Sequence, residues 1–349
     1  MATATAPAPG PKVNHIGLPV LEYRGGKTTL CAGCGHNAIS ERIIDAMYEM
    51  GVQPERVMKM SGIGCSSKSP AYFMNRSHSF NSVHGRMPSV STGAILAQHQ
   101  MRMLGVSGDG DTASIGMGQF VHLLRRNLPM IYIIEDNGVY GLTKGQFSAT
   151  ADIGSKLKTG VINDLPAIDT CALAIQLGAT FVGRSFSGDK RQLLSMLKAA
   201  IAHQGTVMLD VISPCVTFND HEGSTKSYTF TREHYHPAIE ADYVPPAQEI
   251  SVDYPQGEAL PVELHDGSRV VLRKLGASYD PTDRSAAYSF IEQKLKQNEY
   301  VTGLIHIDED VSHEFHALSK TSSVPLNRIP YEKLSPGNAA LEKLLGRYR

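Results

Sequence analysis

Four of the five cysteines lie in sequence surroundings that favour chemistry over packing. Cys31 and Cys34 form a C-x-x-C pair in CAGCGH, Cys65 lies in GIGCSSK, and Cys215 lies in SPCVTFN. Glycine, serine and proline flank them, as is typical of loops. On chemistry alone, such a set indicates an iron-sulfur cluster, a zinc ion, a redox pair or an unrelated group of thiols. The fifth, Cys171, lies in an apolar helical pattern, so we expect it to be a buried thiol.

A second group of residues has the side chains needed to hold a diphosphate through a divalent cation. The sequence GDGDT occupies positions 108–112, and 26 residues separate Gly110 from Asn137. The Asp109 carboxylate, the Asn137 amide and the carbonyl of Val139 are hard oxygen ligands of the kind Mg2+ prefers. Gly108 and Gly110 allow the backbone to approach phosphate. The spacing fits the two-part motif of thiamine-diphosphate enzymes.

The elements that must position these residues alternate between strand and helix patterns. Short apolar runs predict strands, and apolar residues at helical spacing predict helices between them. The predicted strands are 57–61, 103–107, 130–135, 180–182 and 207–212, and the predicted helices are 36–50, 88–101, 115–126, 168–177 and 190–202. This alternation predicts an α/β fold with a parallel sheet flanked by helices.

The residues that could do chemistry follow the ends of these strands. Cys65, the GDGD turn, Asn137 and Cys215 each come shortly after a predicted strand. Loops at the carboxyl ends of parallel strands converge at one edge of the sheet, where ligands bind. We therefore expect the sulfur and carboxylate groups to share that edge.

The chain divides into three predicted parts: an N-terminal Ala/Pro-rich arm (1–27), a cofactor-binding domain (28–222) and a C-terminal extension (223–349). The extension contains a predicted hairpin over 260–274 around Asp266 and Gly267, a helix over 285–297, a strand over 303–308 and a terminal helix over 338–349. We expect the arm to be disordered and the extension to contact a partner subunit.

Composition excludes several classes of protein. Lys and Arg number 33 against 34 Asp and Glu, and no basic block stands out, so nucleic-acid binding is not expected. No stretch approaches the ~18 apolar residues that span a bilayer, so no membrane association is expected. The N-terminus lacks the pattern of a secretion signal, and cytoplasm is the expected location.

The motifs CAGCGH, GIGCSSK, HGR, GDGD, DNGVYGLTKGQ and SPCVTFN occur in this order over residues 28–220. Together they resemble the beta subunit of the 2-oxoacid:ferredoxin oxidoreductases. GIGCSSK, VHGR and GLTKGQ are most similar to the 2-oxoglutarate:ferredoxin oxidoreductase, or KorB-type, chains. Pyruvate or branched-chain 2-oxoacid enzymes are the near alternative. An alternative of another class is a non-catalytic interaction subunit in which the cysteines bind a structural zinc ion.

The resemblance implies a set of cofactors and the residues that bind them. One 4Fe-4S cluster is implied on Cys31, Cys34, Cys65 and Cys215, close to thiamine diphosphate held with Mg2+ by Asp109, Asn137 and Val139. Further cofactor contacts are implied for Ser66, Ser67, His84, Gly85, Gly108, Gly110, Asp111, Gly141, Leu142 and Thr143. His36 follows the C-x-x-C pair, where a helix start or a hydrogen bond is favoured over ligation.

The resemblance also implies a reaction and partners. The 2-oxoacid loses CO2 on thiamine, coenzyme A takes the acyl group, and electrons pass through the cluster to ferredoxin. The glutamate that activates thiamine comes from a separate alpha chain in the family, so an assembly of two alpha and two beta chains is implied. A dicarboxylate substrate needs a second cation. Lys68, Arg76, His78 and Arg86 are the candidates.

Overall fold

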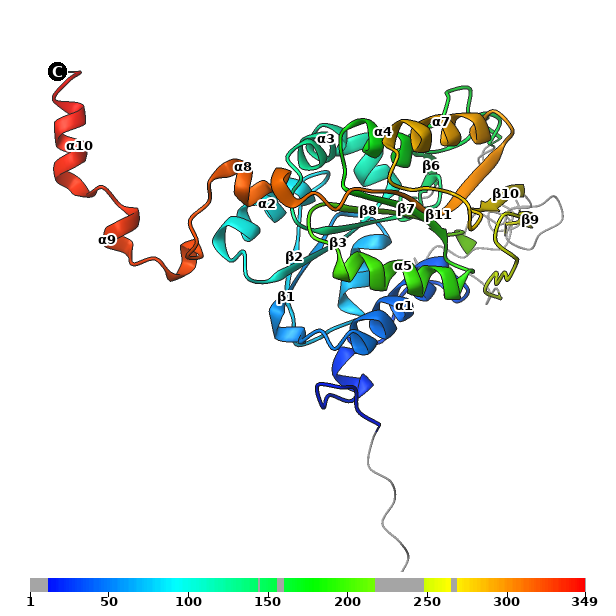
Figure 1. The fold of residues 1–349 in the computed structure, drawn as a ribbon, viewed down its shortest axis with the longest axis horizontal. Helices are drawn as coiled ribbons and strands as arrows, with labels where there is room; N and C mark the ends of the chain where they lie inside the picture. Colours follow the sequence, from blue (N-terminus) through cyan, green and yellow to red (C-terminus); the bar gives the residue numbers. More distant parts are fainter. Residues whose placement is uncertain (1–11, 144, 156–159, 217–247, 265–268, 349) are drawn as a thin grey trace, which may run out of the picture.

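The computed structural model describes residues 12–143, 145–155, 160–216, 248–264 and 269–348, and its centre is one nine-stranded sheet with helices on both faces (Figure 1). The strands of this sheet, in chain order, are β1 (Val57–Ser61), β2 (His78–Asn81), β3 (Arg102–Gly108), β4 (Ile131–Asp136), β7 (Phe181–Phe186), β8 (Val207–Ile212), β9 (Ala259–Glu263), β10 (Arg269–Lys274) and β11 (Glu299–Ile307). A separate two-stranded hairpin joins β5 (Val139–Tyr140) to β6 (Gln146–Phe147).

The sheet has the order β2-β1-β3-β4-β8-β7-β11-β10-β9. From β2 to β7 all neighbouring strands are parallel, as the alternating sequence pattern predicts. β11 then pairs antiparallel with β7, with a bulge between Leu304 and His306. β10 is parallel to β11, and β9 is antiparallel to β10. The extension therefore continues the sheet of the cofactor-binding domain.

Helices cover the sheet because its strands are apolar on both faces, as parallel sheets require. Their bounds are α1 (Gly35–Glu49), α2 (Met87–Ala97), α3 (Met117–Arg125), α4 (Thr170–Gln176), α5 (Lys190–Ala202) and α7 (Arg284–Leu295). One buried cluster joins α2, α3, α4 and α7 to the sheet, and another joins α1 and α5 to the opposite face. Alternate strand residues, such as Ile133 and Ile134, enter opposite clusters.

Shorter helical segments connect these elements. They are η1 (Val20–Tyr23), η2 (Pro54–Arg56), η3 (Ser66–Ala71), η4 (Gly110–Ile115), η6 (Val311–His313), α8 (Phe315–Ser319), η7 (Leu326–Arg328), α9 (Tyr331–Leu334) and α10 (Gly337–Leu345). α9 and α10 contain no buried residue and extend away from the body of the molecule (Figure 1). No helix in the described part of the chain is long and apolar enough to cross a membrane.

Most predicted elements are confirmed, with differences at β7, β2, η4 and β11, which begins four residues before the predicted strand at 303–308. β7 is longer than the predicted strand at 180–182 and completely buried, although Arg184 and Ser185 interrupt its apolar pattern. β2 was not predicted because His78–Asn81 is an exposed edge strand with little apolar character. η4, a π-helical segment, begins directly after Asp109, five residues before the predicted helix. β9 and β10 pair as the predicted hairpin, whose turn residues Asp266 and Gly267 lie outside the described residues.

The predicted disorder of the N-terminal arm is wrong for its described part. The Asn14 side chain donates to the Tyr23 hydroxyl and to the carbonyl of Tyr48, both at 2.9 Å. Tyr23 is completely buried, and its ring contacts the Tyr48 ring edge to face. A buried aromatic ring with a hydrogen-bonded hydroxyl stabilises the arm against α1, which the Ala/Pro-rich residues before it did not suggest.

Candidate functional site

The loops predicted to converge do meet at the carboxyl edge of the parallel strands. The loops with Cys65, the GDGD turn and Asn137 surround a cavity of about 300 Å3, whereas Cys31, Cys34 and Cys215 are not in its lining. Its lining is His36, Ile63, Gly64, Cys65, Ser66, Ser67, Asn81, His84, Gly108, Asp109, Gly110, Asp111, Glu135, Asn137, Val139, Tyr140, Gly141, Leu142 and Thr143. Most of the predicted cofactor residues are in this set. Ile63, Gly64, Asn81, Glu135 and Tyr140 were not predicted.

The three predicted magnesium ligands lie at the ends of two neighbouring strands. Asp109 follows β3 and is 1% exposed, and Asn137 follows β4. The Asn137 side-chain oxygen accepts the N–H of Val139 at 3.2 Å, which closes a tight turn with Gly138 at φ +72°. A left-handed φ favours glycine at that position. The turn brings Val139, the third predicted ligand, to the wall of the cavity.

The charge of Asp109 is controlled by burial and by hydrogen bonds. Burial raises the pKa of Asp109, and hydrogen bonds from Ser148, Thr150 and the backbone of Asn137 lower it in part. Burial and the neighbouring carboxylates of Asp210 and Asp109 raise the pKa of Asp136 well above its usual range. A divalent cation beside Asp109 favours the charged carboxylate. This donor set therefore fits a cation.

Close approach explains why glycine is needed at two positions of the site. A Cβ atom on Gly110 would lie 2.5 Å from the Tyr140 ring, and the Tyr140 hydroxyl donates to the Gly110 carbonyl at 3.0 Å. Gly85 has φ +66°, and a Cβ there would lie 2.8 Å from the backbone of Gly116. Gly110 lines the cavity, and Gly85 lets the loop that carries His84 pack against Gly116.

Asp111 connects the GDGD turn to the loop that carries His84. Its Oδ1 accepts the N–H of Gly85 at 2.7 Å, and its Oδ2 accepts the Ser107 hydroxyl at 2.8 Å. Asp111 is 3% exposed. One buried carboxylate thus holds two loops together and leaves His84 at the cavity wall.

The four loop cysteines come from three loops that the fold brings together. The backbone N–H of Gly35 donates to the carbonyl of Pro214 at 3.3 Å, which joins the C-x-x-C loop to the Cys215 loop. Burial, and then the charges of Cys215, Glu135 and Cys31, raise the pKa of Cys34. Burial raises the pKa of Cys65, with a smaller contribution from Cys31. Cys31 therefore lies within electrostatic reach of both Cys34 and Cys65, and Cys215 within reach of Cys34.

Among the residues that the structure describes, no three His, Cys, Asp or Glu side chains converge as ligands of a single metal ion. Each cysteine of a 4Fe-4S cluster binds a different iron, so the thiols stand apart around the cluster. A set of four thiols in three joined loops fits that arrangement. Cys171 is completely buried in α4 at 3.8 Å from the carbonyl of Gly183, as predicted for a packing residue.

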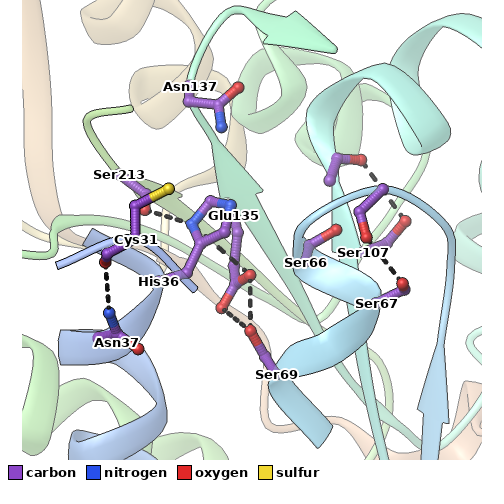
Figure 2. A network of polar contacts seen from close by, with 12 residues as sticks. Cys31, His36, Asn37, Ser66, Ser67, Ser69, Ser107, Glu135, Asn137 and Ser213 are labelled. Atoms are coloured by element: carbon purple, nitrogen blue, oxygen red, sulfur yellow. Dashed lines mark hydrogen bonds and ion pairs between the residues drawn. The ribbon is translucent and has the colours of Figure 1, made fainter. Parts of the chain in front are cut away.

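A buried polar network lies between the cysteine loops and the cavity. Its centre is Glu135 on β4, which is completely buried (Figure 2). Both carboxyl oxygens accept the Ser69 hydroxyl at 3.0 Å. Oε2 lies 3.6 Å from Nδ1 of His36, which also contacts the Ser213 hydroxyl at 2.6 Å. The predicted hydrogen bond of His36 is therefore confirmed.

Burial favours the neutral form of both members of this pair. It lowers the pKa of His36 to about 4 and raises the pKa of Glu135 well above its usual range. Glu135 could not be singled out from the sequence, because MIYIIE is typical of a buried strand. The one available signal was a carboxylate at the end of that apolar run.

The four cations suggested for substrate recognition do not line the cavity. Arg76 forms ion pairs with Glu22 and Glu55, away from the carboxyl edge. His78 begins β2, at the opposite end of the strand from the cavity. Arg86 is exposed and contacts its neighbouring carbonyl. Lys68 lies in η3, and its charge lowers the pKa of Cys65 in part, so it is the cation placed near the cysteine loops.

The comparisons with known proteins agree with this geometry. Residues 62–211 match the family described as the thiamine pyrophosphate enzyme C-terminal TPP binding domain. That segment begins just after β1 and includes β3, β4 and β7 and the loops with Cys65, Asp109 and Asn137. The chain therefore contains a thiamine-diphosphate-binding domain.

The chain is also similar to curated proteins over about half its length. It is 42% identical over 193 residues to a 2-oxoacid:ferredoxin oxidoreductase subunit beta of Sulfolobus sp, which covers 54% of this chain and 63% of that protein. It is 38% identical to the 2-oxoglutarate oxidoreductase subunit KorB of Mycobacterium tuberculosis, covering 54% and 51%. The chain thus spans less than two thirds of the length of these relatives.

Two further relatives extend the comparison. Identity is 35% over 189 residues to the 2-oxoglutarate synthase subunit KorB of Methanocaldococcus jannaschii, covering 54% of this chain and 69% of that protein. The fold is similar to that of a 2-oxoglutarate:ferredoxin oxidoreductase from Magnetococcus marinus with 2-oxoglutarate, coenzyme A and succinyl-CoA bound. The TM-score is 0.65 and the sequence identity 25%, and the match covers 94% of this chain and 91% of that chain. The chain belongs to the family of 2-oxoacid:ferredoxin oxidoreductase beta subunits.

Proposed function

We propose that this protein is the beta subunit of a 2-oxoglutarate:ferredoxin oxidoreductase. The reaction converts 2-oxoglutarate and coenzyme A to succinyl-CoA and CO2, passes two electrons to ferredoxin one at a time, and is reversible. The observation that carries the proposal is the single cavity where the Cys65 loop, the GDGD turn and the Asn137 turn meet. Similarity to KorB chains and to a structure with 2-oxoglutarate bound supports this substrate.

The roles of the chain's own residues follow from their positions. Asp109, Asn137 and the carbonyl of Val139 hold Mg2+ and through it the diphosphate. Cys31, Cys34, Cys65 and Cys215 hold one 4Fe-4S cluster. Thiamine diphosphate, when bound, supplies the nucleophile for decarboxylation, and the cluster carries the electrons away. Ser66, Ser67 and His84 contact the cofactor from the cavity wall.

Two parts of the active complex come from other proteins in this proposal. The glutamate that activates thiamine belongs to an alpha subunit, and two alpha and two beta chains assemble. Glu135 is not that glutamate, because both of its oxygens accept the Ser69 hydroxyl at the floor of the site. Ferredoxin takes the electrons. A cytoplasmic location suits the complex, because a reducing compartment keeps cluster thiols reduced.

Recognition of the second carboxylate of 2-oxoglutarate requires a cation near the cavity. Among the residues first suggested, none lines the cavity, and Lys68 is the one whose charge acts on a residue of its lining, because it lowers the pKa of Cys65 in part. We assign it that role. Arg76 is already paired with two glutamates and is not retained.

The decisive experiment is a viologen-reduction assay with the complex co-purified without oxygen. Coenzyme A-dependent reduction is measured with 2-oxoglutarate, pyruvate and a branched-chain 2-oxoacid. Reduction with 2-oxoglutarate alone is expected. Preference for another acid would overturn the substrate and keep the cofactor assignment. No reduction by any acid, with thiamine and iron present, would overturn the proposed activity.

The metal content of the protein distinguishes this proposal from the alternative of a non-catalytic subunit with a structural zinc ion. About four irons with acid-labile sulfide per beta chain are expected, because a cubane cluster contains four irons and four sulfides. One zinc without iron would instead favour a structural site. The analysis is made on the same anaerobic complex.

A further inference from the structure

Two hydroxyl groups from one short segment contact the buried carboxylate of Asp109. The Ser148 hydroxyl donates to Oδ2 of Asp109, and the Thr150 hydroxyl contacts the same oxygen at 2.8 Å. The two hydroxyls are 2.8 Å apart. Thr150 also lies 2.9 Å from Oδ1 of Asp136. Ser148 and Thr150, which follow Asp109 by 39 and 41 residues, therefore both contact one oxygen of this predicted cation ligand.

The hairpin of β5 and β6 places these hydroxyls. Val139 pairs with Phe147 across the hairpin, and the N–H of Ser148 donates to the carbonyl of Gly138 at 3.0 Å. One end of this hairpin thus begins at Asn137 and Val139, and the other end delivers Ser148 to Asp109. The hairpin therefore connects the turn that carries Asn137 and Val139 to the carboxylate of Asp109, so that all three predicted magnesium ligands are joined through Ser148.

We propose that Ser148 and Thr150 are positioning residues that set the Asp109 carboxylate for the divalent cation. The inference rests on the proposed function, because the cation is part of that function. Hydrogen bonds to one carboxylate oxygen fix the rotation of the carboxyl group. A ligand fixed in this way loses less conformational entropy when the cation binds. Neither residue contacts the cation in this proposal.

Matched variants separate this role from a packing role. Thr150→Val removes the hydroxyl and keeps the shape of the side chain, and Thr150→Ser restores the hydroxyl. Thr170→Val is the control, because the Thr170 hydroxyl donates to the buried carboxylate of Asp210 at 2.9 Å, outside the cation site. Ser148→Ala provides an independent variant should Thr150→Val fail to fold.

Binding is measured without turnover, by titrating Mn2+ into the oxidised co-purified complex with saturating thiamine diphosphate. Free Mn2+ is read at room temperature by electron paramagnetic resonance. Loss of a group that orients a metal ligand weakens affinity by about 10- to 100-fold. We expect a loss in that range for Thr150→Val, a smaller loss for Ser148→Ala, and affinity within about twofold of the unchanged complex for Thr150→Ser and Thr170→Val.

Three results would overturn the inference: unchanged affinity in Thr150→Val and Ser148→Ala, equal weakening in Thr150→Ser, or equal weakening in Thr170→Val. Failure of the proposed function gives a different result. In that case the unchanged complex itself shows no thiamine-dependent binding of Mn2+, before any variant is compared.

Discussion

Asp109 is a carboxylate that the fold buries almost completely at the wall of a cavity. A buried acid of this kind is stable as an anion only beside a positive charge or several donors. Ser148 and Thr150 supply donors, and in our proposal a divalent cation supplies the charge. At the scale of single residues, we therefore expect Asp109 to decide whether the diphosphate can be held.

Asp109→Ala is expected to abolish Mg2+-dependent binding of thiamine diphosphate, because it removes the one carboxylate among the three predicted ligands. Calorimetric titration of thiamine diphosphate with and without Mg2+ measures the effect. Asp109→Asn tests the charge separately, since it keeps the shape of the side chain. Retained binding at normal affinity in Asp109→Ala would refute the assignment of the cation ligand.

The cysteines provide a second prediction at this scale. Cys215→Ala is expected to lose the cluster or leave it incomplete, and Cys171→Ala is expected to keep it, because Cys171 is enclosed by α4 and β7. Iron and sulfide content after anaerobic purification measures both. The opposite pattern would show that a different thiol is the fourth ligand.

At the scale of elements, Lys59 fixes the segment that follows Cys65. Lys59 lies on β1 and is 4% exposed. Its ammonium group donates to the carbonyls of Pro70 and Phe73 at 2.6 and 2.7 Å. It also lies 5.3 Å from the centre of the Phe73 ring. An interior lysine thus ties η3 to the central sheet, and with it Ser66 and Ser69.

Burial lowers the pKa of Lys59 from 10.5 to about 8. Between these values the folded state has lost the proton and the unfolded state still binds it. Stability therefore rises with pH across this window. Relative to Lys59→Met, the free energy of unfolding of the unchanged complex is expected to increase by up to about 3 kcal/mol from pH 8 to 10.5.

Urea unfolding followed by circular dichroism measures this difference. Other groups that titrate in the same range cancel, because both proteins contain them. A difference that is flat with pH would show that Lys59 keeps its ordinary pKa. In that case the two hydrogen bonds to carbonyls offset the cost of burial.

At the scale of the whole molecule, the C-terminal part has two different relations to the sheet. β11 pairs with β7 and adds the extension to the main sheet. α8 is attached through Phe315, which is 4% exposed and whose N–H donates to the carbonyl of Asn127 at 3.2 Å. Beyond these contacts, α9 and α10 bury no residue. The extension is therefore both a part of the core and an exposed arm.

Removal of residues 331–349 is expected to leave the sheet intact and to weaken association with the partner subunit. None of the deleted residues that the structure describes is buried, so backbone amide exchange in β3, β4 and β8 should not change. Recovery of the alpha subunit with tagged beta chain measures association. Unchanged recovery would contradict a partner contact by this arm.

The sequence predicted most of the elements and the outline of the candidate site. The strand and helix order from 57 to 212 follows from hydrophobic periodicity, which burial in a two-sided parallel sheet imposes on each segment locally. Cys65, Asp109, Asn137 and Cys215 each follow a strand, so the topology alone brings them to one edge. Such local signals can be read without knowing any side-chain contact.

Only the tertiary structure decided which distant side chains meet. Ser148 and Thr150 contact Asp109 from the loop after β6. Glu135 on β4 contacts His36 in α1 and Ser69 in η3, three elements that are far apart in the sequence. The sequence made Arg76 a candidate for substrate binding, but in the structure Arg76 forms ion pairs with Glu22 and Glu55. The physical reason is the same in each case: periodicity reports which face of an element is buried, whereas a hydrogen bond or ion pair depends on how separate elements pack in three dimensions.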